Sequence, residues 1–135
     1  IVNDGCYYKP YYVERIVSPS GEIMEQFEPE IVKEIDVAKD TFRIIKEGMR
    51  RVVESGTGYL ANIEEMKIAG KTGTAQNPQG ENHAWFIGFA PFEHPEVCIT
   101  VFIEHGGDGS ATAAPIAGNI IRKYFQLKYL QIVKG

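Results

Sequence analysis

The residues with the most distinctive chemistry lie in one short segment, Ile68 to Gln76. The segment is strand-like, but it carries a lysine, two threonines and two glycines where a core strand would carry branched apolar residues. A glycine within a strand lets another backbone approach closely, threonine hydroxyls can donate to an anion, and a lysine adds positive charge. These properties favour a ligand-binding edge. An exposed edge strand whose lysine only discourages aggregation would have the same composition, so both interpretations stay open on these residues alone.

Two glycine patterns in the chain are typical of nucleotide sites, and neither has the required context. Gly70-Lys71-Thr72 could end a phosphate-binding loop, but that loop needs a glycine five positions earlier, where Glu65 stands. Gly56 to Ala61 fits the spacing of dinucleotide folds, yet it follows a predicted helix where the fingerprint demands a strand. We therefore expect no nucleotide site, and we interpret Gly56 to Ala61 as a loop that stops a helix.

The histidines and cysteines do not indicate a metal centre. His83, His94 and His105 recur every eleven residues, but regular spacing does not bring imidazoles together, and no carboxylate cluster completes a ligand set. Cys6 and Cys98 match no paired spacing used for zinc or dithiol chemistry. We expect three unrelated histidines, a buried free thiol at Cys98, no metal and no cofactor.

The composition is that of a folded globular chain. Hydrophobic residues make up 44% and charged residues 24% of the 135 residues. The formal net charge is -4 and there is no dense basic run, so nucleic-acid binding is not expected. No apolar stretch approaches the roughly 18 residues that a membrane-spanning helix requires. No repeat or long linker divides the chain, which we treat as one unit over residues 1–135.

The pattern of apolar residues predicts an α+β chain. A hairpin is expected from the β-prone residues 11–17, the turn 18–21 and the alternating residues 22–27. The other expected elements are a helix capped by Asp40 or Thr41 and ending at Ser55-Gly56, strands over residues 67–76, 84–90 and 97–104, and a closing helix over residues 113–129. Short connections between the three strands favour an antiparallel sheet, packed against the helices.

The apolar faces of the two helices can also be assigned from their spacing. The stripe of the first helix consists of Phe42, Ile45, Met49, Val52 and Val53. The stripe of the closing helix consists of Ile116, Ile120, Ile121, Tyr124 and Leu127, with Ser110 or Thr112 as its cap.

The segment around Lys71 resembles a known family. Lys71-Thr72-Gly73 matches the lysine-threonine-glycine box of penicillin-binding proteins and serine β-lactamases. Residues 69–76 followed by residues 83–91 resemble class B penicillin-binding proteins specifically, and Asn3-Asp4-Gly5 and residues 113–117 are similar to the same family. The resemblance implies a fold of the penicillin-binding and serine β-lactamase type, with residues 1–135 as the C-terminal part of a transpeptidase domain.

The resemblance also implies a reaction and a role for each residue of the box. In that family a serine attacks the D-Ala-D-Ala end of a peptidoglycan stem peptide, forms an acyl-enzyme, and passes the acyl group to a second peptide; β-lactams imitate the donor. By similarity, Lys71 supplies a positive field, Thr72 and Thr74 offer hydroxyls to the donor carboxylate, and Gly73 leaves room for the donor backbone. The backbone N–H of Thr74 would form half of the oxyanion hole.

The family's other two motifs place a serine three residues before a lysine and a serine two residues before an asparagine. Neither arrangement occurs at Ser18, Ser20, Ser55 or Ser110. We therefore expect the nucleophile on sequence before Ile1, the upstream half of the domain as the partner of this chain, and no activity from the chain alone. The family further implies an extracytoplasmic location, with the parent protein anchored in the bacterial cytoplasmic membrane by an N-terminal helix.

The sequence alone leaves alternative functions open. The same fold could serve as a noncatalytic binding or interaction module, and a β-lactam sensor or serine β-lactamase shares the box, although residues 74–76 and Trp85-Phe86 resemble those proteins less. Adjacent residues of a strand face opposite sides, so the side chains of Trp85 and Phe86 are expected on opposite faces of the sheet. We favour core packing for both, with a lining role for one of them as the alternative.

Overall fold

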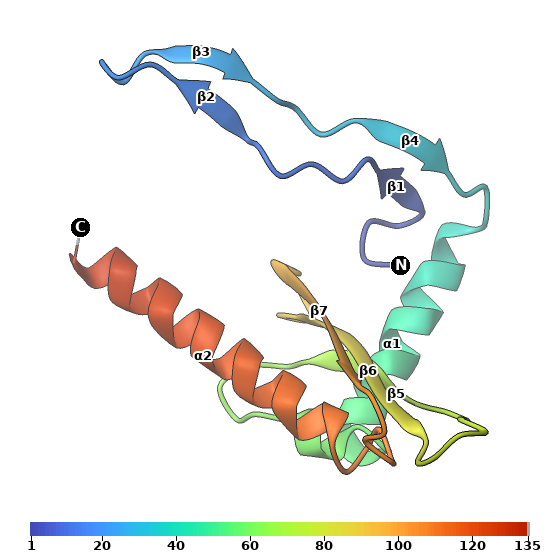
Figure 1. Cartoon of the computed structure of the whole chain (residues 1–135). Coiled ribbons are helices and arrows are strands. Elements are labelled where there is room, and N and C mark those ends of the chain that lie inside the picture. Colours follow the sequence, from blue (N-terminus) through green and yellow to red (C-terminus); the bar gives the residue numbers. More distant parts are fainter. Residues whose placement is uncertain (135) are drawn as a thin grey trace. The chain divides into compact units, whose positions relative to one another are not determined.

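The computed structural model describes the backbone of residues 1–134 (Figure 1). The chain forms two compact units, and the boundary between them falls after Phe42. This boundary lies within helix α1 (Lys39–Ser55). Because a helix rather than a linker crosses it, composition alone does not reveal the division.

The first unit is a long antiparallel hairpin built from two short ladders. Strand β2 (Arg15–Val17) pairs with β3 (Ile23–Gln26), and β1 (Cys6–Tyr8) pairs with β4 (Ile31–Glu34), each pair with one irregularity in its register. Gly21 closes the tip with a φ of +88° and donates its N–H to the Ser18 carbonyl at 2.9 Å. The predicted hairpin is confirmed for β2 and β3, whereas the β1–β4 ladder was not predicted.

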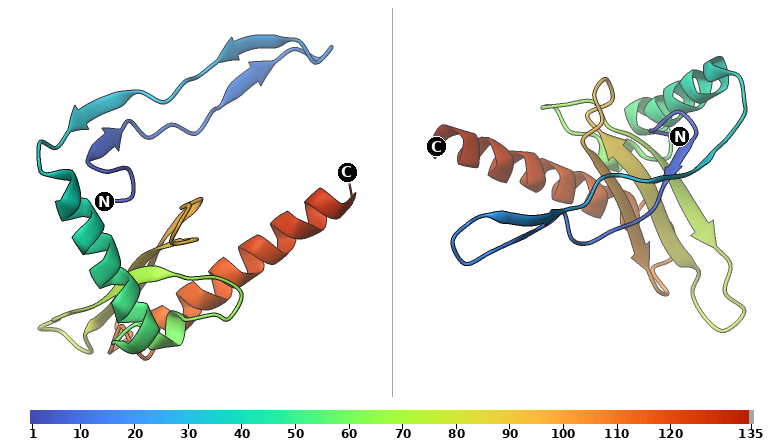
Figure 2. Two further views of the ribbon diagram at one scale, coloured as in Figure 1. Left: turned by 180° about the vertical axis from the view of Figure 1, so that it is seen from behind. Right: turned by 90° about the horizontal axis from the view of Figure 1, so that it is seen from above.

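The second unit contains most of α1, the short 3-10 helix η1 (Tyr59–Ala61), a three-stranded sheet and helix α2 (Ala113–Lys134). The sheet has the antiparallel order β5-β6-β7, with β5 at Ala69–Ala75, β6 at His83–Ala90 and β7 at Val97–Ile103. All three strands agree with the sequence prediction, and so does the α+β fold class. Figure 2 shows the strands side by side with α2 against the sheet.

The core lies between one face of the sheet and the helices. Phe86 and Val101 belong to this face and pair with each other across β6 and β7. They are buried in one cluster with Val53 of α1, Ala61 of η1 and residues of α2. Burial of this contiguous apolar surface stabilises the unit and fixes which face of the sheet the helices cover.

Helix α2 buries a different stripe from the one that the sequence predicts. The buried residues are Ala113, Ala114, Ala117, Ile121 and Phe125. Ile116, Ile120, Tyr124 and Leu127 are 40–51% exposed, so of the predicted stripe only Ile121 is in the core. The reason is close packing: a Cβ on Gly118 would lie 2.8 Å from the Ala61 carbonyl oxygen, and only a face of small residues allows that approach.

The ends of the helices also differ in detail from the prediction. Helix α1 begins at Lys39, so Asp40 and Thr41 lie in its first turn rather than before it. Its predicted stripe is buried at Phe42 and Val53, while Ile45 is 39% exposed. Among residues 1–134, no helix combines the length and the apolar character needed to cross a lipid bilayer.

Candidate active-site strand

The Lys-Thr-Gly segment lies on β5, an edge strand of the sheet as far as residues 1–134 define it. Residues directly opposite each other in an antiparallel ladder share a face. Thr72 pairs with Phe86 and therefore shares the face that carries the core. Lys71 pairs with Ile87 and lies on the opposite face, where Ile87 is 44% exposed. The strand thus presents its cation on one face and its hydroxyls on the other.

Lys71 is exposed, and its ammonium group is held close to its own strand. Its Nζ donates to the Thr72 carbonyl oxygen at 2.7 Å. In an antiparallel ladder, alternate residues direct both their N–H and their C=O away from the partner strand. The carbonyl of Thr72 is reached by a side chain at the edge of the sheet, as expected for a residue whose backbone groups point outward. Thr74 lies two residues further along β5, so its backbone groups point to the same side.

The two threonine hydroxyls each have a partner from another loop. The Oγ1 of Thr72 lies 2.7 Å from the Oγ1 of Thr57, which follows α1. The Oγ1 of Thr74 accepts a hydrogen bond from the N–H of Gly109 at 3.3 Å, in the loop before α2. Neither Thr57 nor Gly109 was identified from the sequence, because only the fold brings them to β5.

The two glycines of the segment have different roles. A Cβ on Gly70 would overlap the ring of Phe86 and lie 2.8 Å from the Ile87 carbonyl oxygen, so Gly70 serves the core. A Cβ on Gly73 would meet only the Cβ of Trp85, at 3.3 Å. Gly73 is therefore less closely covered than Gly70, although a side chain there would press against Trp85.

The loop that supports Thr74 is ordered by Asp108. Its carboxylate accepts hydrogen bonds from the backbone N–H groups of Ser110, at 2.7 Å, and Ala111, at 3.1 Å, and from the Ser110 hydroxyl. The Ser110 hydroxyl, followed by these N–H groups and a smaller contribution from Thr74, holds the pKa of Asp108 below its ordinary value of 3.8. Thr112 directly precedes α2, but its hydroxyl donates to the carbonyl oxygens of Gly106 and Asp108 instead of accepting from the helix.

The aromatic pair on β6 divides between the two faces. Phe86 is fully buried. Trp85 is 36% exposed on the face of Lys71, with its ring centroid 4.4 Å from that of Phe102. The expectation that both residues pack in the core is therefore wrong for Trp85. Cys98 also lies on this open face and is exposed, so the expectation of a buried thiol is wrong as well.

Two of the three histidines meet, contrary to the sequence interpretation. The rings of His83 and His105 are 5.2 Å apart, and the His105 N–H donates to Nδ1 of His83 at 3.0 Å. The reason is that β6 begins at His83 and β7 ends just before His105, so antiparallel pairing places them together. Within residues 1–134, no group of three or more histidines, cysteines or carboxylates could hold a metal ion.

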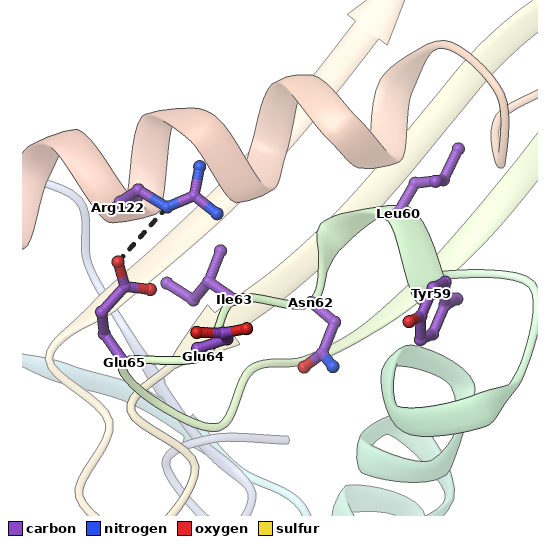
Figure 3. Close-up of a pocket in the computed structure, with 7 residues that line it drawn as sticks. All are labelled: Tyr59, Leu60, Asn62, Ile63, Glu64, Glu65 and Arg122. Carbon is purple, nitrogen blue, oxygen red and sulfur yellow. Dashed lines mark ion pairs between the residues drawn. The ribbon is translucent and has the colours of Figure 1, made fainter.

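A surface hollow of about 420 Å³ lies between α2 and the segment that follows η1 (Figure 3). It is lined by Tyr59, Leu60, Asn62, Ile63, Glu64, Glu65 and Arg122. The Nε of Arg122 and Oε1 of Glu65 form an ion pair at 3.6 Å. No residue of the Lys-Thr-Gly segment lines the hollow. Glu65, which stands where a phosphate-binding loop would need a glycine, is ion-paired with Arg122.

Comparison with known proteins identifies the family. Residues 1–122 match the penicillin binding protein transpeptidase domain. The chain therefore belongs to the penicillin-binding protein transpeptidase family, and the resemblance to class B members expected from the sequence is confirmed.

Individual relatives agree in sequence and in structure. The peptidoglycan D,D-transpeptidase MrdA of Haemophilus influenzae is 32% identical over 99% of this chain, and stage V sporulation protein D of Bacillus subtilis is 34% identical over 90%. The D,D-transpeptidase domain of a peptidoglycan glycosyltransferase from Eggerthella lenta superposes with a TM-score of 0.81 at 33% identity, over 96% of this chain. Penicillin-binding protein A from M. tuberculosis, in an acyl-enzyme complex with ceftriaxone, gives 0.77 at 29% identity over 90%.

The chain spans only part of these proteins. It covers 23% of the H. influenzae protein and 20% of the B. subtilis protein. It covers 30% and 29% of the two matched structures. The fold and the family are thus established for this chain.

Proposed function

We propose that residues 1–135 are the C-terminal part of the transpeptidase domain of a peptidoglycan D,D-transpeptidase, and that β5 forms one wall of its active site. The observation that carries the proposal is the open edge of β5. It combines an exposed lysine, two hydroxyls on the opposite face and a glycine at which an added Cβ would meet only the Cβ of Trp85, at 3.3 Å. This combination suits an acyl donor that adds to the strand by main-chain hydrogen bonds.

The reaction that we propose proceeds through an acyl-serine. The serine oxygen bonds to the carbonyl carbon of the penultimate D-alanine, and the terminal D-alanine leaves with the proton that the serine gives up. The amine of a second stem peptide then attacks the ester, forms the cross-linking peptide bond and returns the proton to the serine. A β-lactam would follow the first step only, since its opened ring stays attached.

Each residue of the segment has a role in this scheme. Lys71 provides positive charge that favours the anionic species formed during acylation. Thr72 and Thr74 donate hydroxyl protons to the carboxylate of the donor or of the β-lactam. The N–H of Thr74, on the outward side of the ladder, donates to the developing oxyanion together with the N–H of the serine.

The serine and the proton-transferring groups would come from the upstream half of the domain. Support comes from the share of the matched structures that this chain covers and from the absence of either serine motif in its 135 residues. We further propose that the complete protein acts outside the bacterial cytoplasmic membrane, anchored there by an N-terminal helix, where its peptidoglycan substrate is found.

Covalent labelling with a fluorescent penicillin tests the proposal. The complete protein should be labelled at a serine outside this chain, whereas the 135-residue chain alone should remain unlabelled. A complete protein that folds but takes no label would instead support a noncatalytic binding module. Label attached to the isolated chain would contradict the proposed division of the active site.

A further inference from the structure

Thr57 lies in a loop whose backbone is fixed by the end of α1. The N–H groups of Gly56 and Gly58 both donate to the Val52 carbonyl oxygen, at 3.1 and 2.9 Å. A Cβ on Gly56 would lie 2.9 Å from the Cα of Val52, and one on Gly58 would lie 3.1 Å from its Cγ1. The flanking glycines therefore hold the loop close to the helix, and Thr57 projects from a defined position.

The hydroxyl of Thr57 lies beside the hydroxyl of Thr72. Its Oγ1 lies 2.7 Å from the Oγ1 of Thr72, a good distance for a hydrogen bond between hydroxyls. A hydroxyl has one proton to donate and two lone pairs to accept with. If Thr72 is to donate its proton to an anion, Thr57 must be the donor in this pair.

Thr74 provides a parallel on the same face of the strand. Its Oγ1 accepts from the Gly109 N–H, which can act only as a donor. The Gly109 bond therefore leaves the proton of Thr74 unused, and the Asp108 carboxylate, whose pKa a Thr74 side-chain hydrogen bond helps to lower, is one acceptor for it. A donating Thr57 would likewise make the Thr72 hydroxyl an acceptor from the protein, so that the Thr72 proton is left for a ligand.

We infer that Thr57 is a positioning residue for the donor carboxylate: it donates to Thr72 and so orients the Thr72 proton toward the anion. The inference rests on the proposed function, since it assumes that Thr72 binds this carboxylate. Successive hydrogen bonds polarise one another, and the Thr57 bond strengthens the one that Thr72 makes. Thr57 itself need not touch the substrate.

The test uses the complete protein and the second-order rate of acylation by benzylpenicillin. Thr57→Val removes the hydroxyl and keeps the shape, and Thr57→Ser keeps the hydroxyl. We expect Thr57→Val to slow acylation about tenfold, the effect of losing roughly one hydrogen bond in a charge-binding network. Thr57→Ser should stay within about twofold of the parent protein, with unfolding temperatures unchanged for both.

A double-mutant cycle separates positioning from a structural role. If Thr57 acts through Thr72, then Thr57→Val should have no further effect in a Thr72→Val background. Additive losses in the double variant, or a parental rate for Thr57→Val alone, would overturn the inference. Failure of the proposed function gives a different result: Thr72→Val itself would then leave acylation unchanged, or the parent protein would not be acylated.

Discussion

Gly109 supports strand β5 by close contact with the backbone of Gly73. A Cβ on Gly109 would overlap the carbonyl oxygen of Gly73 and would lie 2.5 Å from that of Trp85. The loop before α2 therefore meets β5 and β6 at their backbones, on the face opposite Lys71. The position of the Lys-Thr-Gly segment depends on a residue without a side chain at position 109.

Gly109→Ala should consequently displace β5. The new methyl group meets backbone rather than a flexible side chain, so we expect a loss of about 1–3 kcal/mol in the free energy of unfolding, the usual effect of overpacking. Acylation of the complete protein by penicillin should slow as well. The matched control is Gly48→Ala within α1, where nothing lies within 4 Å and the free energy of unfolding should rise by about 0.5–1 kcal/mol. Equal behaviour of the two variants in thermal melts would show that the close contact is not real.

Lys71→Ala should lower the rate of acylation by at least about two orders of magnitude, the scale for losing one preorganised electrostatic group. Lys67→Ala is the control, because the Lys67 side chain forms a surface ion pair with Glu93, at 2.6 Å with both side chains at least half exposed. Its acylation rate should equal that of the parent protein. Stopped-flow measurement of penicillin binding compares the two, and a folded Lys71→Ala variant with parental acylation would refute the assigned role.

The two glycines of the segment should separate fold from function. Gly70→Ala places a methyl group into the ring of Phe86, so it should lower the unfolding temperature strongly. Gly73→Val meets only the Cβ of Trp85, at 3.3 Å, which a shift of a few tenths of an ångström relieves, so the fold should survive while acylation falls by about two orders of magnitude, because the donor backbone loses its space. Parental acylation by a folded Gly73→Val protein would show that no ligand backbone lies there.

The sequence was sufficient where a local pattern decides the structure. Strands β5, β6 and β7 were predicted because turn-rich connections separate β-prone runs, and Lys71 to Thr74 were identified because their residue types are wrong for a core strand. The resemblance then supplied roles that spacing alone could not.

The sequence was insufficient where packing between distant segments decides. Ile116 and Ile120 are more hydrophobic than Ala113 and Ala117, yet the alanines are buried because α2 approaches the sheet and η1 closely. Thr57 and Gly109 are distant in sequence from the threonines that they contact, and only the folded chain brings them together. Trp85 and Cys98 are exposed because they lie on the face of the sheet opposite the core cluster. The hydrophobicity of a side chain does not reveal which face of the sheet it occupies.

Asp108 should make the stability of the segment's supporting loop depend on pH. Its pKa is lowered in the folded state, chiefly by the Ser110 hydroxyl, so its ionised form stabilises the fold above the ordinary value of 3.8. This contribution should be lost as the pH falls through the lower pKa of the folded state. Asp108→Asn can still accept from the N–H groups of Ser110 and Ala111, but it carries no charge.

Thermal melts of the complete protein between about pH 7 and pH 2 test this dependence. The parent protein should be more stable than Asp108→Asn at neutral pH, and the difference should disappear in acid. Ser110→Ala removes the largest cause of the shift, so the difference should then disappear at a higher pH, nearer 3.8. A difference between parent and Asp108→Asn that stays constant over the whole range would mean that the charge of Asp108 does not stabilise the loop, and that only its shape matters for holding Gly109 against β5.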